Sequence, residues 1–414
     1  MRENTVAMSR ECVEGSPVSL EDVVRLGAQE MLRRALTVEV EAFVELYSKR
    51  RQPDGRAVVV RNGYQQERSV LMSGGSIPVK VPRTRSQEDD IASFVSRLVP
   101  PYRRRSLRID EAIPTLYLAG ISTGKMMPAL KALFGEQIKG MSPTTVSRLK
   151  SVWVQQHQEW SKRDLSKEHY CYLWCDGIHF TTRFDDDRLC VLVVIGARRD
   201  GTKELVAVSS GYRENEAHWA ELLRDLRDRG MTCPELFIAD GALGLWRAIA
   251  QVYPQARGQR CWVHKTSNII LKLPKAVQGR AKSMLAQIYL APTREKARTA
   301  WKAFRVAYGD KYPAAVGCLD KDDTALLAFF DFPAQHWQHI RSTNVIESTF
   351  ATVRLRTETT RGHGTESTTF AMVFKLLSEA QKGWRKLRGY RLISNVINGV
   401  QFVNGEKKIL KKAA

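Results

Sequence analysis

Three acidic residues lie in surroundings that are otherwise apolar or basic, and such acids are candidates for chemistry. Asp176 lies inside the apolar stretch LWCDGIHF, Asp240 ends the stretch LFIAD, and Glu347 begins the basic stretch ESTFATVRLRT. A carboxylate is costly to bury in an apolar strand unless it is paired or bound to a metal ion. We therefore take these three residues as candidates for one shared site.

Each acid also has a simpler structural explanation when it is taken alone. Asp176 could cap a strand end or bond a neighbouring amide. Asp240 could be the N-cap of a helix that begins near Ala242, and Glu347 could be a solvated acid favoured by the helix dipole. These alternatives stay open, although two strand acids and one helix acid can converge in a single fold. Three further acids form a predicted hairpin turn and are interpreted as solvated: Asp185, Asp186 and Asp187.

Three carboxylates that converge would favour hard divalent cations. Mg²⁺ binds oxygen ligands and keeps several waters, so a few carboxylates and substrate phosphate oxygens can hold it. Two such ions about 3.5–4 Å apart can activate an attacking water or 3′-hydroxyl and stabilise the leaving oxygen. The acids therefore predict in-line phosphoryl transfer with two Mg²⁺ ions, for which Mn²⁺ would be able to substitute.

The charge of the chain indicates a polyanionic partner. It carries 65 Lys or Arg against 44 Asp or Glu among 414 residues, a net charge of +21, and nucleic acid is the commonest such partner. A basic, well-solvated surface is the alternative. Arg354 lies seven residues after Glu347, two helical turns along the same face, where it could hold a phosphate of double-stranded DNA. Residues 351–414 carry 13 Lys or Arg and 4 Asp or Glu, which also fits a DNA backbone.

Composition argues against membrane and secreted proteins. No apolar run approaches the roughly 20 residues that span a bilayer, and the N-terminus MRENTVAMSRECVEG lacks the apolar core of a signal peptide. The seven cysteines are odd in number and irregularly spaced, so we expect reduced thiols. These features predict a cytoplasmic, nucleoid-associated protein that has no membrane partner.

The elements around the first two acids predict a mixed sheet. Three closely spaced strand candidates suggest antiparallel hairpins: HYCYLWCDGIHFTTRF, LCVLVVIGAR and GTKELVAVSSG. An amphipathic helix, the buried strand PELFIAD, the helix GALGLWRAIAQVY and the strand GQRCWVH then follow. This order gives an α/β fold with helices on the faces of a mixed sheet, as in ribonuclease-H-like nucleotidyl-transfer domains. Residues 265–340 are interpreted as a helical insertion before Glu347.

The N-terminal third is predicted to be mainly helical with one hairpin. Ser19 is a candidate N-cap, and residues 61–85 contain two extended runs around SGGS, typical of a hairpin. Ser142, followed by a proline, predicts the second helix of a helix-turn-helix, with an ordinary helical hairpin as the alternative. Pro128 requires the first helix to start late or to kink. Four residues of the second helix suit phosphate and base contacts: Thr144, Thr145, Arg148 and Lys150.

Cys261 and His264 form a Cys-x-x-His pair, which on spacing alone is half of a zinc site. No second pair with zinc-like spacing follows it, although Cys171 and Cys175 could complete a site if the strands brought them together. A nucleophilic Cys–His pair is another alternative. We expect instead that the pair ends a strand beside Asp240, where His264 reaches DNA or supports the geometry of the site.

The motifs CDGIHF, FIADGALGLWRAI, QRCWVHKTSNI and STNVIESTFATVRLRT occur in this order along the chain. Together they resemble the motifs of Mutator-type transposases of bacterial insertion sequences, which are DDE transposases. RNGY, PVKVPRTR, MSPTTVSRL and FKLLSEAQKGWRKL resemble landmarks nearer the two ends of that family. The resemblance covers most of the chain. It implies that Asp176, Asp240 and Glu347 are the metal-binding Asp-Asp-Glu triad, with a helical insertion before the glutamate.

The same resemblance extends to residues around the triad. Arg354 matches the basic residue that follows the glutamate by seven positions, and Cys261 with His264 matches the family's Cys-x-x-His signature. The chain departs from the expected pattern at Pro128 and in residues 359–368, which leaves the detail of the DNA contacts open.

A member of this family would bind the terminal inverted repeats of its own element. It would cut the 3′ ends with the help of Mg²⁺ and join the freed 3′-hydroxyl to target DNA, and the resemblance favours a homodimer. The alternatives are a metal-dependent nuclease of the same fold without strand joining, and a non-catalytic DNA-binding regulator derived from a transposase. The predicted domains are an N-terminal helical and hairpin region (1–100), a helix-turn-helix DNA-binding domain (101–165), a ribonuclease-H-like catalytic domain (166–264 and 341–400), a helical insertion (265–340) and a basic tail (401–414).

Overall fold

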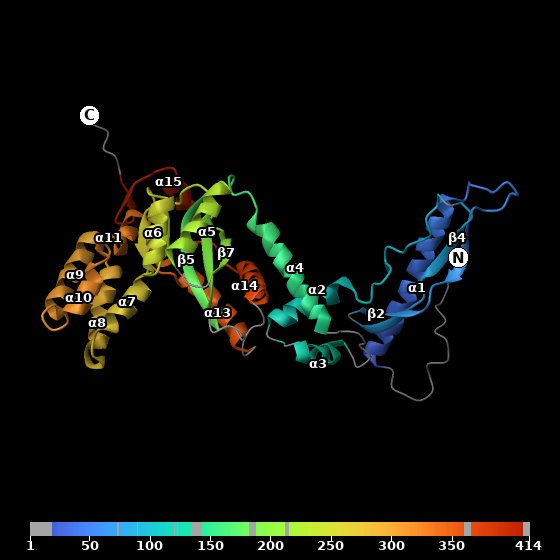
Figure 1. Cartoon of the computed structure of the whole chain (residues 1–414), viewed down its shortest axis with the longest axis horizontal. Coiled ribbons are helices and arrows are strands. Elements are labelled where there is room, and N and C mark those ends of the chain that lie inside the picture. The colour runs from blue at the N-terminus through green and yellow to red at the C-terminus, as the bar shows by residue number, and fades with distance from the viewer. Residues whose placement is uncertain are drawn as a thin grey trace, which may run out of the picture. The chain divides into compact units, whose positions relative to one another are not determined.

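The chain divides into two compact units in the computed structural model, Met1–Val146 and Ser147–Ala414 (Figure 1). The structure describes residues 19–72, 74–88, 90–119, 121, 123–134, 143–181, 188–211, 215–359 and 366–408. Within these ranges, none of the helices combines the length and the apolar character needed to cross a bilayer.

The first unit packs a long helix against short antiparallel strands. The helix α1 (Leu20–Leu46) begins after Ser19, whose Oγ accepts a hydrogen bond from the backbone N–H of Asp22 at 3.1 Å, so the predicted N-cap is confirmed. The strands are β1 (Val59–Tyr64), β2 (Arg68–Met72), β3 (Gly75–Val79) and β4 (Pro82–Ser86). β2 pairs with β3, as predicted for the hairpin across SGGS, and β1 pairs with β4. The buried side chains of Leu36 and Val40 join α1 to this core.

Three helices follow these strands: α2 (Leu107–Leu118), α3 (Thr123–Phe134) and α4 (Pro143–Ser161). Pro128 is the sixth residue of α3, and the helix continues through it, although a proline there removes one intrahelical hydrogen bond. α4 begins at Pro143, as the Ser-Pro pair predicts, while Ser142 itself lies outside the described residues.

The second unit is built on a five-stranded mixed sheet, so the predicted α/β sheet is confirmed. The strand order is β7-β6-β5-β8-β9. β5 pairs antiparallel with β6, and β6 with β7, whereas β5–β8 and β8–β9 are parallel. The strands are β5 (Tyr170–Thr181), β6 (Arg188–Arg198), β7 (Lys203–Gly211), β8 (Leu236–Ala239) and β9 (Gly258–Arg260).

Both faces of this sheet are covered (Figure 1). On one face, α5 (Glu216–Asp228) and α6 (Leu243–Val252) pack on a buried core that includes Leu173, Cys175 and Phe237. On the other face, the Tyr172 hydroxyl bonds His336 Nδ1 at 2.7 Å and the Trp174 indole donates to the carbonyl of His339 at 2.9 Å. Residues 172–175 therefore alternate between the two faces of the sheet, and this alternation puts Asp176 on the Trp174 face.

A group of helices, olive to orange in Figure 1, separates β9 from the helix that carries Glu347. It contains α7 (Trp262–Ile270), α8 (Lys275–Tyr289), α9 (Arg294–Tyr308), α10 (Pro313–Asp320), α11 (Asp323–Leu326) and α12 (Trp337–Ile340). The predicted strand GQRCWVH is wrong beyond Arg260, because Trp262 already begins α7. The indole of Trp262 packs against Tyr289 and Trp301, and this tertiary packing outweighs the strand preference of a Cys-Trp-Val sequence.

The chain then returns to the sheet with α13 (Asn344–Thr359) and α14 (Glu366–Gln381), followed by α15 (Ile393–Ile397). α13 contacts β5, and α14 contacts β7. Part of the predicted basic tail is folded: β10 (Phe402–Val403) and β11 (Glu406–Lys407) form a hairpin. The backbone of Gly405 in this hairpin bonds to Phe330 and Ala334.

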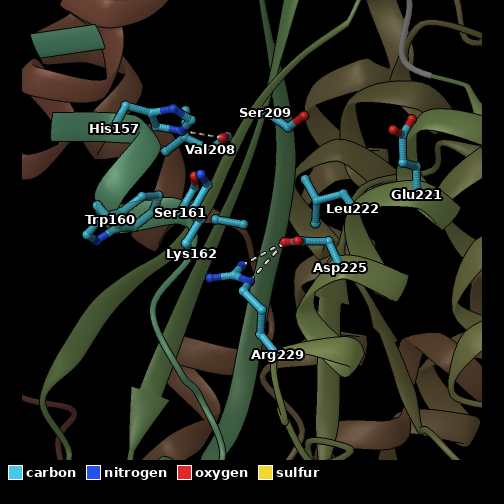
Figure 2. Close-up of a pocket in the computed structure, with 11 residues that line it drawn as sticks. His157, Trp160, Ser161, Lys162, Val208, Ser209, Glu221, Leu222, Asp225 and Arg229 are labelled. Atoms are coloured by element: carbon cyan, nitrogen blue, oxygen red, sulfur yellow. Dashed lines mark hydrogen bonds and ion pairs between the residues drawn. The ribbon is translucent and has the colours of Figure 1, made fainter. Parts of the chain in front are cut away.

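Side chains cover the outer edge of β7, which is an edge strand of the sheet. His157 Nε2 donates to the carbonyl of Val208 at 3.1 Å, as Figure 2 shows, and Arg163 donates to the carbonyl of Leu205 at 2.8 Å. The side chain of Gln381 accepts from the N–H of Leu205 at 2.7 Å. Open strand edges pair readily with other chains, so these contacts protect the sheet. A pocket of about 540 Å³ lies beside this edge, between α4, β7 and α5.

Candidate active site

Asp176 and Asp240 lie at the same level of neighbouring strands. β5 and β8 run parallel, and their last registered pair is Cys175 opposite Ala239. Each aspartate is the next residue in its own chain segment. Both acids therefore lie where β8 reaches its carboxyl end, the edge at which open α/β sheets bind ligands.

Each aspartate also bonds its local backbone through one carboxylate oxygen. Asp176 Oδ1 accepts from the N–H of Gly177 at 2.9 Å, and Asp240 Oδ1 accepts from the N–H of Ala242 at 2.8 Å. The N-cap of α6 is Ala242, two residues after Asp240, so the proposed N-cap role of Asp240 is not the one seen. Both aspartates are half-buried, and these bonds orient the carboxylates without closing them off from solvent.

Glu347 lies in the first turn of α13, as predicted. Its backbone N–H donates to the carbonyl of Thr343 at 3.0 Å, and its Oε1 accepts from the Thr343 hydroxyl at 2.6 Å. The side chain is 31% exposed, so it is anchored at one oxygen while the carboxylate reaches the surface.

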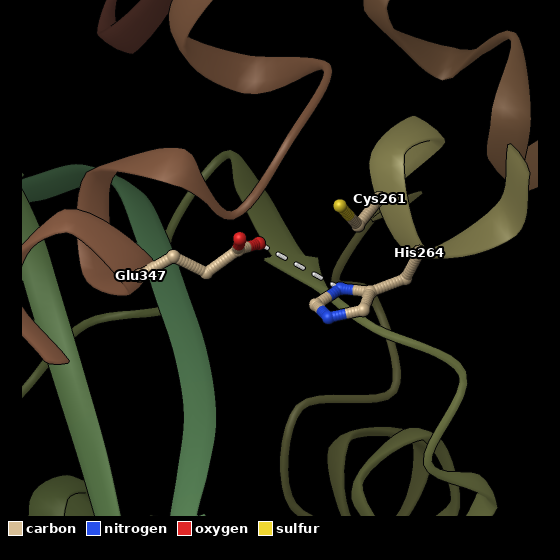
Figure 3. Close-up of side chains that lie close together, drawn as sticks. All are labelled: Cys261, His264 and Glu347. Carbon is tan, nitrogen blue, oxygen red and sulfur yellow. Dashed lines mark ion pairs between the residues drawn. The ribbon is translucent and has the colours of Figure 1, made fainter. Parts of the chain in front are cut away.

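Cys261 and His264 lie next to this glutamate and join it to the end of β9 (Figure 3). Cys261 is the N-cap of α7, and its N–H donates to the carbonyl of Ala239 at 2.8 Å. His264 Nδ1 lies 3.8 Å from Glu347 Oε1. Cys261, His264 and Glu347 form a group whose ligand atoms all lie within 4.8 Å of one another.

Electrostatic interactions link the group of Cys261, His264 and Glu347 to Asp176. The hydrogen bond to Cys261, the negative charge at that thiol, and the charges of Glu347 and Asp176 together raise the pKa of His264 to about 9, against the effect of burial. Burial opposes ionisation of Cys261, but hydrogen bonds with His264 and Thr343 outweigh it and lower the pKa of the thiol. The imidazole thus lies within reach of charges on both β5 and α13.

The structure brings together some of the predicted residues and leaves others apart. Among the described residues, neither aspartate belongs to the 4.8 Å group around Glu347, and neither do Cys171 and Cys175. The zinc site completed by those two cysteines is therefore not formed. The strand expected to end at His264 ends earlier, at Arg260, and His264 lies in the first turn of α7.

Thr343 was missed by the sequence analysis although it contacts every member of this group. Its hydroxyl lies 3.2 Å from Cys261 Sγ and 3.3 Å from His264 Nδ1, in addition to its bond with Glu347. A threonine directly before a predicted helix is an N-cap candidate, and that signal alone could have singled it out.

A buried ion cluster adjoins Asp240. Arg260 Nη2 lies 3.1 Å from Asp322 Oδ2, and Lys265 also pairs with this carboxylate. A Cβ on Gly241 would lie 2.7 Å from Arg260 Nη2, so the guanidinium packs directly against the residue that follows Asp240. The cluster joins β9 and α7 to the residue before α11.

The predicted DNA-binding residues lie on two helices. Arg354 is exposed on α13, and the other four residues lie in the first half of α4. The acids predicted to be solvated in the β5–β6 turn, residues 185–187, lie outside the described residues.

The family model and the most similar relatives by sequence agree on one family. The family model described as "Transposase, Mutator family" matches residues 2–387. The transposase for insertion sequence element IS6120 of Mycolicibacterium smegmatis is 46% identical over 297 residues, which cover 72% of this chain and 92% of the relative. The transposase for IST2 of Acidithiobacillus ferrooxidans is 45% identical over 281 residues, 68% of this chain and 95% of the relative. The solved Drosophila P element transposase strand transfer complex matches 70% of this chain and 84% of its own, at 12% identity. Its TM-score of 0.28 is too low to establish a shared fold.

Proposed function

Because the chain belongs to the Mutator family of transposases, we propose that it moves an insertion sequence by DNA cleavage and strand transfer. It would bind the terminal inverted repeats of its element, hydrolyse the phosphodiester bond at each 3′ end, and transfer the freed 3′-hydroxyl to a phosphodiester bond of target DNA. The observation that carries this proposal is the alignment of Asp176 with Asp240, one residue beyond the last registered pair of β5 and β8.

The donor set suits divalent cations. Asp176, Asp240 and Glu347 offer carboxylate oxygens, the ligands that Mg²⁺ and Mn²⁺ prefer over soft donors. When bound, two such ions would supply the positive charge that activates the attacking oxygen and stabilises the leaving oxygen. The residues of the chain would hold the carboxylates in place: Gly177 and Ala242 through their N–H groups and Thr343 through its hydroxyl. The sheet would thereby fix the direction from which the DNA strand is attacked, in a ribonuclease-H-like arrangement.

Basic residues would bind the DNA backbone around this site. Arg354 follows Glu347 by two helical turns and is exposed, so it can reach a phosphate near the reacting bond. Thr144, Thr145, Arg148 and Lys150 would read the inverted repeat from α4. Two element ends must be held together for joining, which favours a homodimer.

Substitution of the three acids tests the proposal. The inverted repeats are read from the DNA that flanks the gene, and a labelled end fragment is incubated with purified protein, target plasmid and Mg²⁺ or Mn²⁺. We expect Asp176→Asn, Asp240→Asn and Glu347→Gln each to lower cleavage and joining by at least about a hundredfold, because each removes a metal ligand. End binding, measured by gel shift, should change little.

Glu221→Gln is the matched control, since Glu221 is an exposed acid of α5 beside the pocket in Figure 2. This variant should cleave and join like the wild type. Wild-type protein that cleaves but never joins would be a nuclease, and wild-type protein that binds ends without cutting would be a regulator. Either result would overturn the proposal, and a fully active variant would remove its acid from the site.

A further inference from the structure

The two ends of the helical insertion meet at Thr343. The chain leaves the sheet at Cys261 and returns at Thr343, the residue directly before α13. Trp262 N donates to the carbonyl of Arg341 at 2.9 Å, and Thr343 N lies 3.4 Å from Cys261 Sγ. Thr343 has no exposed surface, so water cannot compete for its hydroxyl.

The hydrogen bonds of this hydroxyl can be assigned by counting protons. A threonine hydroxyl has one proton to donate and two lone pairs to accept with, whereas an ionised carboxylate only accepts. The shortest contact, 2.6 Å, runs to Glu347 Oε1 and has the length of an O–H···O⁻ bond. The proton is therefore assigned to the bond with Glu347, a lone pair faces His264 Nδ1 at 3.3 Å, and Cys261 Sγ, an acceptor, lies 3.2 Å away as the weaker alternative for the same proton.

In this assignment, His264 and Cys261 both help to orient the hydroxyl of Thr343. His264 Nδ1 faces a lone pair of the hydroxyl, and Cys261 Sγ already accepts a hydrogen bond from the N–H of Thr343 at 3.4 Å, so the hydroxyl proton is directed toward Glu347 on α13. Cys261 is itself held by its backbone bond to Ala239 at the end of β8. A continuous set of bonds thus runs from the strand that precedes Asp240 to the carboxylate of Glu347.

We propose that Thr343 is a positioning residue for the metal site, and that its hydroxyl holds Glu347 so that Oε2 is presented to a divalent cation. In the described part of the chain, the contacts of the Glu347 carboxylate are made by Oε1. The inference rests on the proposed role of Glu347 as a metal ligand. Cys261 and His264 act through the hydroxyl, which gives the Cys-x-x-His pair a role that needs neither zinc nor a nucleophile.

Two matched comparisons isolate the hydroxyl. In the first, Thr343→Val removes the hydroxyl of the wild type at nearly constant shape, while Thr343→Ser retains it. Thr343→Ser and Thr343→Ala differ by the hydroxyl alone, so this second pair decides the question even if the valine variant fails to fold. Thermal unfolding of each variant identifies those that are folded.

Binding of Mn²⁺ to the full-length protein on element-end DNA, followed by electron paramagnetic resonance, is the main measurement. We expect Thr343→Val and Thr343→Ala to weaken Mn²⁺ binding about ten- to hundredfold, the usual effect of losing a residue that orients a ligand. Thr343→Ser should remain close to the wild type. The rate of cleavage should fall in the variants that lose Mn²⁺ affinity, and it should recover partly at high Mn²⁺ concentration. The affinity for DNA should not change.

Asp240→Asn serves as the reference variant, because it removes a proposed ligand directly. If Asp240→Asn lowers Mn²⁺ affinity while the valine and alanine variants match the wild type, the positioning role is wrong and the metal site stands. If Asp240→Asn leaves Mn²⁺ binding unchanged, the proposed metal site itself fails. Equal loss in Thr343→Ser and Thr343→Ala would show that packing, and not the hydroxyl, is what Thr343 contributes.

Discussion

One oxygen atom, the hydroxyl of Thr343, contacts Cys261, His264 and Glu347 and argues against a zinc ion at this group. Zn²⁺ would lie about 2.0–2.3 Å from sulfur, nitrogen and carboxylate ligands, but the Thr343 hydroxyl lies within 3.3 Å of all three ligand atoms. All three ligand atoms are already engaged by this hydroxyl and would have to give up these contacts to bind an ion, so we expect purified protein to contain far less than one zinc per chain. Mass spectrometry of the metal content and thermal unfolding with and without a chelator measure this. Stoichiometric zinc, or unfolding on chelation, would make the pair structural ligands.

The acids of the candidate site could be singled out from the sequence, but the contacts around them could not. Asp176 and Asp240 stand out because each interrupts or ends an apolar strand, and strand signals are local. The hydroxyl group of Thr343 meets Cys261, which is 82 residues earlier in the chain. No periodicity or spacing encodes that contact, since it depends on how the insertion closes upon itself.

At the scale of elements, the start of the insertion is held by a shared carboxylate. Asp322 pairs with both Arg260 and Lys265, and all three side chains are at most 15% exposed. Removing one member of a buried ion cluster leaves charge without a partner. We therefore expect Asp322→Asn to lower the free energy of unfolding by about 3 kcal/mol, measured by urea denaturation. Asp310→Asn, at an exposed acid of the same insertion, is the control and should have no effect.

A stability of Asp322→Asn equal to that of Asp310→Asn would show that solvent already screens the cluster.

Such clusters also explain why element boundaries are hard to predict. The strand β9 ends at Arg260, where the chain turns to form this ion cluster and to bury Trp262, and the local sequence alone favours a longer strand. The three long strands β5, β6 and β7 were predicted well, because their apolar runs are bounded by turn residues.

At the scale of the whole molecule, net charge and fold class follow from composition and from the order of strand and helix signals. The boundaries of a stably folded unit do not follow from composition or from these signals. They depend on which segment of the chain covers which edge of the sheet. The predicted catalytic domain starts at residue 166, whereas α4, which ends at Ser161, and the residues just after it carry His157 and Arg163 onto β7.

That covering of β7 has a consequence for the solubility of shortened proteins. A fragment that starts at residue 166 would lack both side chains and would leave the carbonyls of Leu205 and Val208 on an open strand edge. Two such fragments could then join edge to edge and continue the sheet from one molecule into the next. We expect this fragment to self-associate in light scattering, and a fragment from Ser147 onward to stay dispersed at the same concentration. If both fragments stay dispersed, α14 protects the edge alone. If only the shorter fragment self-associates, α4 has a task besides its proposed reading of DNA, which is to keep neighbouring copies from polymerising through their sheets.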